Sequence, residues 1–246
     1  MKQTSKNSSL VKMIAVAFIS ISIFLTSCTT NDPALKLATK PEAVAANNAS
    51  SAGVYKGIIV GSSGYFSLSI KNGNDSTTCK FVFDGKEVTL TSASFGSWTS
   101  GQLISNALFT GTLNGQTISL TFSCNADGSD PVTIVTIPGH TVYSTVIKEK
   151  SDMLVKCYEG TYTVAKKTGT INGTWNFVAY KPGTGNGSLV AGYHADPDSN
   201  GEIYGDEVDG VLQIGDGILQ MTEAKVSGSF KNSSDELVTV TGKRTY

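Results

Sequence analysis

The sequence predicts an all-β fold built from antiparallel strands that follow one another along the chain. Apolar and polar residues alternate with period two in many short segments, for example in residues 66–70 and 118–122. Two dipeptides that favour tight hairpin turns, Asp84-Gly85 and Asn114-Gly115, separate segments of this kind. No segment after residue 50 has the period of a long amphipathic helix. We therefore predict an antiparallel meander that forms a barrel or a sandwich.

Strand-like segments recur from residue 51 to the C-terminus. We predict strands at 66–70, 81–83, 88–90, 108–109, 118–122, 132–137, 141–147, 154–158, 160–164, 174–180, 211–214, 218–221, 225–231 and 237–241. A weak internal repeat pairs Gly53-Val54-Tyr55 with Gly160-Thr161-Tyr162, so residues 51–150 and 151–246 are expected to be two similar β halves. Two arrangements are consistent with this pattern: two tandem sheets divided near residues 148–156, or one continuous barrel or sandwich with a shared core.

The first 27 residues have the features of a secretory signal peptide. Lys2, Lys6 and Lys12 precede an apolar run of 13 residues, Met13 to Leu25, which is too short to span a bilayer comfortably. The run ends in Leu25-Thr26-Ser27-Cys28, which resembles the lipobox of bacterial lipoproteins. The resemblance implies that residues 1–27 are removed and that Cys28 becomes the first residue of the mature chain, modified with lipid such as palmitate.

Residues 28–50 are predicted to be a flexible tether behind this cysteine. The segment is rich in Ala, Asn, Thr and Lys, contains Pro33 and Pro41, and lacks a sustained apolar period. Together with Asp75-Ser76-Thr77, which matches a short O-glycosylation motif, the leader resembles lipoproteins of the Bacteroidetes type. The strand pattern is similar to that of uncharacterised β-rich secreted lipoproteins, including lipocalin-like barrels. These resemblances imply a bacterial cell-envelope protein, lipid-anchored at the outer membrane.

The charge of the chain argues against a nucleic-acid partner. Removal of the leader lysines changes the formal net charge from −1 to −4, and no basic patch is evident. The acidic residues concentrate in the second half, because no Lys or Arg lies between Lys181 and Lys225. A solvated acidic surface and a divalent cation are the two ways in which such a segment is accommodated.

Three cysteines remain after Cys28, namely Cys79, Cys124 and Cys157. Each shares the strand parity of neighbouring apolar residues, so all three should point into a core. A Cys79–Cys124 disulfide and buried free thiols are the two alternatives. No Cys-x-x-Cys pair or Cys/His cluster indicates zinc or redox chemistry.

The segment from residue 196 to residue 207 fits the EF-hand-like calcium-loop pattern D-x-[DN]-x-[DN]-G-x5-E. Oxygen ligands at alternate positions let a short arc of chain surround a hard cation, and the glycine permits the turn. The predicted Ca²⁺ ligands are Asp196, Asp198, Asn200, Glu202 and Glu207. Neither flank resembles an EF-hand helix, which puts the closing role of Glu207 in doubt, and the same residue types also suit a polar hairpin turn.

Other candidate residues are few. His194 and Asp196 are two residues apart, a spacing that would place an acid/base pair on one strand face, although a histidine beside a polar loop is more often simply exposed. An aromatic platform for a sugar or another flat ligand could be formed by Trp98, Trp175, Tyr180 and Tyr193. Trp175 shares the parity of Phe177 and is expected in the core, so Trp98 is the better exposed candidate.

Common hydrolase and nucleotide-binding signatures do not occur in the sequence, so we do not predict an enzyme. We expect a membrane-anchored, Ca²⁺-stabilised binding or structural module whose partner is a glycan or a small apolar ligand. An extracellular glycan-acting enzyme and a cell-envelope assembly component are the alternatives. A carboxylate pair in a cleft would favour the enzyme, and an apolar barrel cavity would favour ligand binding.

Overall fold

The structure is a computed structural model that describes residues 37–73, 76–183 and 185–246. The predicted signal peptide, Cys28 and the first residue of the Asp75-Ser76-Thr77 motif lie outside the described residues. The described residues form one compact unit. It consists of antiparallel strands, as the alternating sequence predicted, and of one short 3₁₀ helix at Ala45–Asn47.

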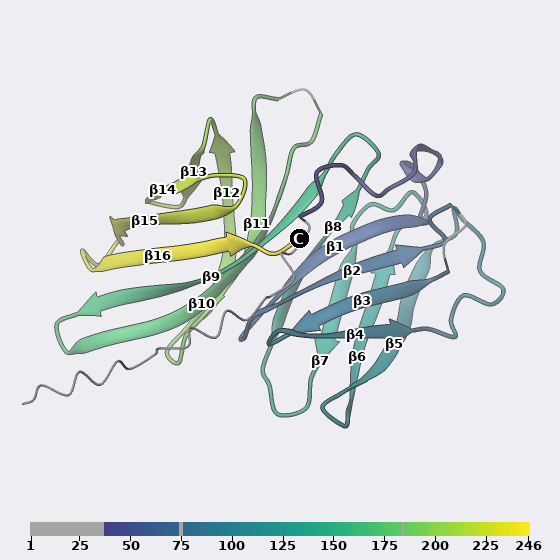
Figure 1. Cartoon of the computed structure of the whole chain (residues 1–246), viewed down its shortest axis with the longest axis horizontal. Coiled ribbons are helices and arrows are strands. Elements are labelled where there is room, and N and C mark those ends of the chain that lie inside the picture. Colours follow the sequence, from purple (N-terminus) through teal and green to yellow (C-terminus); the bar gives the residue numbers. More distant parts are fainter. Residues whose placement is uncertain (1–36, 74–75, 184) are drawn as a thin grey trace, which may run out of the picture. The chain divides into compact units, whose positions relative to one another are not determined.

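The first half is an eight-stranded antiparallel sheet with the order β7-β6-β5-β4-β3-β2-β1-β8 (Figure 1). Its strands are β1 (Gly53–Val60), β2 (Gly64–Ile70), β3 (Thr78–Phe83), β4 (Lys86–Thr91), β5 (Ile104–Leu113), β6 (Gln116–Cys124), β7 (Val132–Thr136) and β8 (Tyr143–Glu149). The sheet is nearly closed, because a hydrogen bond of 3.0 Å joins the hydroxyls of Thr133 and Ser144 on its two edge strands.

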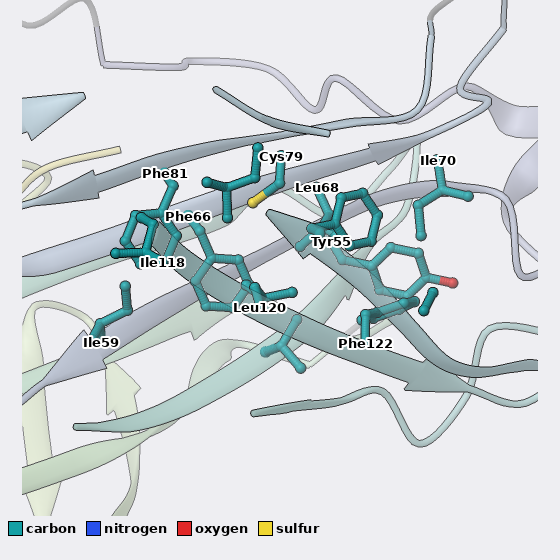
Figure 2. Close-up of a cluster of buried hydrophobic side chains, with 14 of the residues drawn as sticks. Tyr55, Ile59, Phe66, Leu68, Ile70, Cys79, Phe81, Ile118, Leu120 and Phe122 are labelled. Carbon is teal, nitrogen blue, oxygen red and sulfur yellow. The ribbon is translucent and has the colours of Figure 1, made fainter. Parts of the chain in front are cut away.

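The core of this half is densely aromatic. Tyr55 and Phe122 lie edge to face with ring centroids 4.7 Å apart, among the side chains that Figure 2 shows. Phe66, Phe81 and Phe122 are fully buried, which accounts for the period-two pattern of β2, β3 and β6. The large side chains of alternate positions pack into this interior.

The second half is a closed barrel in which consecutive strands pair and β16 returns to β9 (Figure 1). Its strands are β9 (Val155–Lys166), β10 (Gly169–Tyr180), β11 (Gly187–Ala195), β12 (Asn200–Val208), β13 (Val211–Ile214), β14 (Gly217–Met221), β15 (Lys225–Lys231) and β16 (Leu237–Arg244). The two halves thus repeat one eight-stranded meander, and the internal repeat falls on β1 and β9, the first strand of each half.

The predicted turns are confirmed. Asp84 and Gly85 join β3 to β4 with φ values of 49° and 72°, and Asn114 and Gly115 join β5 to β6 with φ values of 53° and 78°. Two consecutive residues with positive φ match the right-handed twist of the flanking strands, which is why Asp-Gly and Asn-Gly occur there.

One prediction of local structure is wrong. Residues 200–207, which the calcium pattern placed in a loop, belong to strand β12 and pair with β11. The loop is only the four residues from Asp196 to Ser199. Ile203 is buried while its neighbours Glu202 and Tyr204 are exposed, so the segment has the alternation of a half-buried strand.

The two halves share a third cluster of buried side chains. Ile58 and Tyr65 from the first half pack there with Cys157, Val178 and Ala191 from the second. Strand β1 is consequently buried on both faces, whereas most other strands have one exposed face. The boundary between the halves falls between Glu149 and Val155, within the range predicted for tandem sheets.

Residues 42–48 differ from the predicted flexible tether. The backbone N–H groups of Glu42 and Val44 donate to Glu149 and Asn72 at 2.6 and 3.1 Å. The side chain of Asn47 is buried and donates to Asn72 at 3.4 Å. These bonds order the segment against the first half, because its small and amide side chains satisfy polar groups at the end of β2.

All three remaining cysteines are buried and free, so the disulfide alternative is wrong for Cys79 and Cys124. Burial in apolar surroundings raises the pKa of the Cys157 thiol to about 12 and raises that of Cys79 as well. Among the described residues, no helix is long and apolar enough to cross a membrane.

Candidate functional site

The interior of the second barrel is filled at one end. Tyr158 and Phe177 stack face to face, with ring centroids 4.9 Å apart and an angle of 9° between the rings. Leu212 and Val226 pack with them and are almost completely buried. A larger space lies toward the other end of the barrel, near the β11–β12 and β15–β16 turns.

That space is a cavity of about 300 Å³. Its walls are mainly apolar and aromatic, and polar side chains gather where β11 meets the turn to β12. The apolar lining consists of Val164, Trp175, Ile203, Ile214, Leu219, Phe230, Val238 and Val240, and the polar lining of Tyr162, His194, Asp196, Ser199 and Asn232. A mostly apolar cavity with a few convergent polar groups is the usual form of a small-molecule site.

Two glycines fix the indole that lines this cavity. Trp175 is buried, as its parity predicted, and its Nε1–H donates to the carbonyl of Thr241 at 3.0 Å. Gly160 on β9 pairs with Gly242 on β16, and a Cβ at Gly160 would overlap the indole nitrogen. The missing side chains open a slot in which the indole lies, so Trp175 presents one fixed surface to the cavity.

The polar end of the cavity is organised by a hydrogen-bonded chain of three side chains. The Tyr162 hydroxyl donates to Asp196 Oδ2 at 2.6 Å and lies 3.3 Å from Nδ1 of His194. Tyr162 is on β9 and Asp196 follows β11, with β10 between them. Gly173 on β10 pairs with Tyr162, and its lack of a Cβ lets the phenol ring reach across that strand.

This chain determines the tautomer of His194. The single hydroxyl proton of Tyr162 goes to Asp196, so the hydroxyl oxygen can only accept from Nδ1–H of the neutral imidazole. The Nε2 atom of His194 then carries a lone pair, and it has no hydrogen-bond partner among the described residues. A ligand that donates a hydrogen bond could use this acceptor.

Burial and hydrogen bonding shift the pKa values of these groups. Desolvation lowers the pKa of His194 below 6.5, although Asp196 opposes the shift, so the imidazole is neutral at pH 7. Burial alone would raise the pKa of Asp196, but hydrogen bonds from Tyr162, Asp198 and Ser199 outweigh it and hold that pKa below 3.8. Desolvation and the bond to Asp196 raise the pKa of Tyr162. The polar end is therefore negatively charged, and no Lys or Arg side chain lines it.

The predicted Ca²⁺ ligands do not converge in this structure. Asp196 Oδ1 accepts the backbone N–H groups of Asp198 and Ser199 at 2.7 Å each, so its carboxylate closes the turn. Asp198 lies 3.3 Å from Lys166. Asn200 begins β12, and Glu207 is seven residues further along this strand, about 23 Å away at roughly 3.3 Å per residue.

The two predicted glutamate ligands, Glu202 and Glu207, accept hydrogen bonds from other groups of the protein. Glu202 accepts the hydroxyls of Tyr193 and Tyr204 at 3.1 and 2.8 Å. Glu207 accepts the backbone N–H of Gly210 at 2.8 Å. Within residues 37–73, 76–183 and 185–246, no group of three or more His, Cys, Asp or Glu side chains could hold a metal ion. Ca²⁺ binding stays a prediction.

The sequence predicted two of the three side chains in this hydrogen-bonded chain, His194 and Asp196. The spacing of His194 and Asp196 placed both on one strand face, and the structure brings them together through Tyr162. No protein family matches this chain, and neither a curated protein nor a solved structure does. The geometry of the barrel therefore carries the functional argument alone.

Proposed function

We propose that this chain is a lipid-anchored, exported binding protein whose second barrel holds a small, mostly apolar ligand noncovalently. The observation that carries this proposal is the cavity of about 300 Å³ between Trp175 and Asp196. Export and anchoring rest on the leader and on Cys28, which resemble those of bacterial lipoproteins. The anchor would place the cavity close to a membrane, where apolar molecules accumulate.

The polar end of the cavity indicates which end group the ligand carries. Asp196 is a carboxylate and His194 Nε2 is a hydrogen-bond acceptor, so both favour a ligand that donates a proton in a hydrogen bond. An amine or an alcohol fits this requirement. A carboxylate would meet the charge of Asp196 in a partly desolvated setting, which costs free energy.

The experiment uses three probes that share one chain and differ in their end group: octylamine, octanol and octanoate. Each is titrated below its micelle concentration while the fluorescence of Trp175 is followed in a Trp98→Phe background, which leaves one tryptophan. Burial of an apolar chain at about 0.8 kcal/mol per CH₂, less the cost of association, predicts dissociation constants between about 1 µM and 1 mM. The expected order of affinity is octylamine, octanol and then octanoate.

A cavity-filling variant tests where the probes bind. Val240→Phe adds a ring inside the cavity, whereas Val132→Phe adds the same atoms at a strand position that is 57 % exposed. The proposal predicts that Val240→Phe abolishes binding and that Val132→Phe leaves it unchanged, with both variants folded by circular dichroism. Equal binding by the two variants, or no binding of any probe to the parent protein, would refute the proposal.

Ca²⁺ stabilisation is a separate proposal with its own test. An ion at the β11–β12 hairpin would have to displace hydrogen bonds that Asp196 now accepts. Thermal unfolding is compared in EDTA and in millimolar Ca²⁺, because free ligand at about 100 times its dissociation constant adds roughly 2.7 kcal/mol to the folded state. A melting temperature that rises with Ca²⁺ in the parent protein but not in an Asp196→Ala/Asp198→Ala variant supports the ion site. Coincident unfolding curves in EDTA and Ca²⁺ contradict it.

A further inference from the structure

A second cavity lies outside the barrel interior. It is a cleft of about 740 Å³ whose floor is the outer face of β9 and β10 and whose wall comes from the loop before β8 and from Tyr143. The floor consists of two cross-strand pairs, Thr161 with Thr174 and Thr163 with Asn172. Because residues of one parity share a face, these side chains form a small array that points away from the barrel core.

The lining of this cleft is polar but nearly uncharged. Threonine, tyrosine and asparagine side chains dominate it, and Asp196 is its one acidic or basic residue among the described residues. Thr163, Asn172 and Thr174 have no side-chain hydrogen bond to any described residue, so their donors and acceptors are available to a ligand. Such a surface offers little to a nucleic acid or an anion, and it suits a neutral molecule with many hydroxyl groups.

The wall adds a flat aromatic surface. Tyr143 lines the cleft, and its ring stacks on that of Tyr193 with centroids 5.6 Å apart and an angle of 21°. Tyr193 in turn donates to Glu202 at 3.1 Å, and Tyr204 donates to the other oxygen of this carboxylate at 2.8 Å. The stacked pair is therefore held in place before any ligand arrives, which reduces the entropic cost of binding.

We infer that this cleft binds a neutral oligosaccharide. A sugar ring has an apolar face that packs on an aromatic ring, and hydroxyls around its edge that donate and accept hydrogen bonds. The Tyr143 ring and the threonine and asparagine floor supply the two complementary surfaces. The cleft lies within the volume range of small-molecule sites, so a short oligosaccharide is the expected ligand.

The test measures binding of neutral disaccharides and trisaccharides of hexose and N-acetylhexosamine, in α and β linkage, by isothermal titration calorimetry with the full chain. Binding of at least one of them with a dissociation constant below 10 mM is expected. Tyr143→Ala should weaken it about tenfold, the effect of roughly 1.4 kcal/mol. Thr163→Val should also weaken it severalfold, while Thr170→Val, an isosteric change at an exposed β10 position outside the cleft, should not.

Two further results separate this cleft from the barrel cavity. Val240→Phe fills the barrel cavity and should leave saccharide binding unchanged, and Tyr143→Ala should leave octylamine binding unchanged. The inference is overturned if no member of the saccharide panel binds below 10 mM. It is also overturned if the best-bound saccharide has the same affinity for Tyr143→Ala, Thr163→Val and the parent protein.

Discussion

Lys56 and Glu149 form a buried ion pair at the junction of the two halves, and its removal gives the sharpest stability prediction. Nζ of Lys56 lies 2.7 Å from Glu149 Oε2, and both side chains are 0 % exposed. Glu149 also accepts the backbone N–H groups of Glu42 and Val155 at 2.6 and 3.0 Å. One carboxylate thus connects the N-terminal segment, β1 and the start of the second barrel.

The perturbation is Lys56→Met, which keeps an unbranched apolar stem and removes the charge. Glu149 would remain buried with two N–H donors but without a cation. Breaking a buried pair on one side costs about 3–5 kcal/mol, and the two remaining donors place the expected loss near the lower end, about 3 kcal/mol. In the double variant Lys56→Met/Glu149→Gln the uncompensated charge is gone, and the amide oxygen still accepts one of the two N–H groups, so we expect part of the loss to be recovered.

Urea unfolding followed by circular dichroism measures these free energies by linear extrapolation, provided that the slope is the same for all variants. Lys80→Met is the control, because the Lys80–Glu87 ion pair joins side chains that are 41 % and 58 % exposed. Loss of this exposed pair should lower the free energy of unfolding by less than about 1 kcal/mol. The reasoning is refuted if Lys56→Met costs less than about 1 kcal/mol, or if the double variant is no more stable than the single one.

Three further predictions concern the second half. Gly160→Ala should push the Trp175 indole out of its slot, shift the tryptophan emission and lower the free energy of unfolding by roughly 1–3 kcal/mol. Gly96→Ala is the control, because no atom lies within 4 Å of the added Cβ, and it should change neither the emission nor the stability. The thiol of Cys157 should not react with an aromatic disulfide reagent at pH 8 in the native protein and should react in urea, because burial raises its pKa to about 12. The pKa of His194 is lower in the folded state than in the unfolded state, so the unfolded chain takes up a proton first as the pH falls below 6.5. The stability of the parent protein should therefore decrease between pH 7 and 5. A His194→Gln variant should lose less stability over this range.

Most of the fold could be predicted from the sequence because its signals are local. Strand alternation reports which face is buried, and Asp84-Gly85 and Asn114-Gly115 report where the chain reverses. Strands β11 and β12 were harder to predict from the sequence. Glycine weakens the alternation of Gly187–Ala195, and the aspartate, asparagine and glycine residues near the start of β12 suit a metal loop and a hairpin equally well. Closure into a barrel depends on the pairing of β9 with β16, which are distant in sequence and carry no local signal.

The candidate site was only partly predictable for the same reason. His194 is on β11 and Asp196 follows the last residue of this strand, so their common face could be inferred from their spacing of two residues. Tyr162 joins them from two strands away, across Gly173, and that contact depends on the register of three strands. A glycine opposite a tyrosine in a predicted hairpin was the signal that could have indicated it, because a missing Cβ leaves room for a large ring.

A crystal structure of the protein grown with octylamine tests the central claim most directly. We predict electron density for the alkyl chain between Trp175, Leu219 and Val240, with its amine within hydrogen-bond distance of Asp196 or of His194 Nε2. A barrel interior in which these side chains close on one another and leave no room for the chain, at an octylamine concentration far above the measured dissociation constant, would contradict the account.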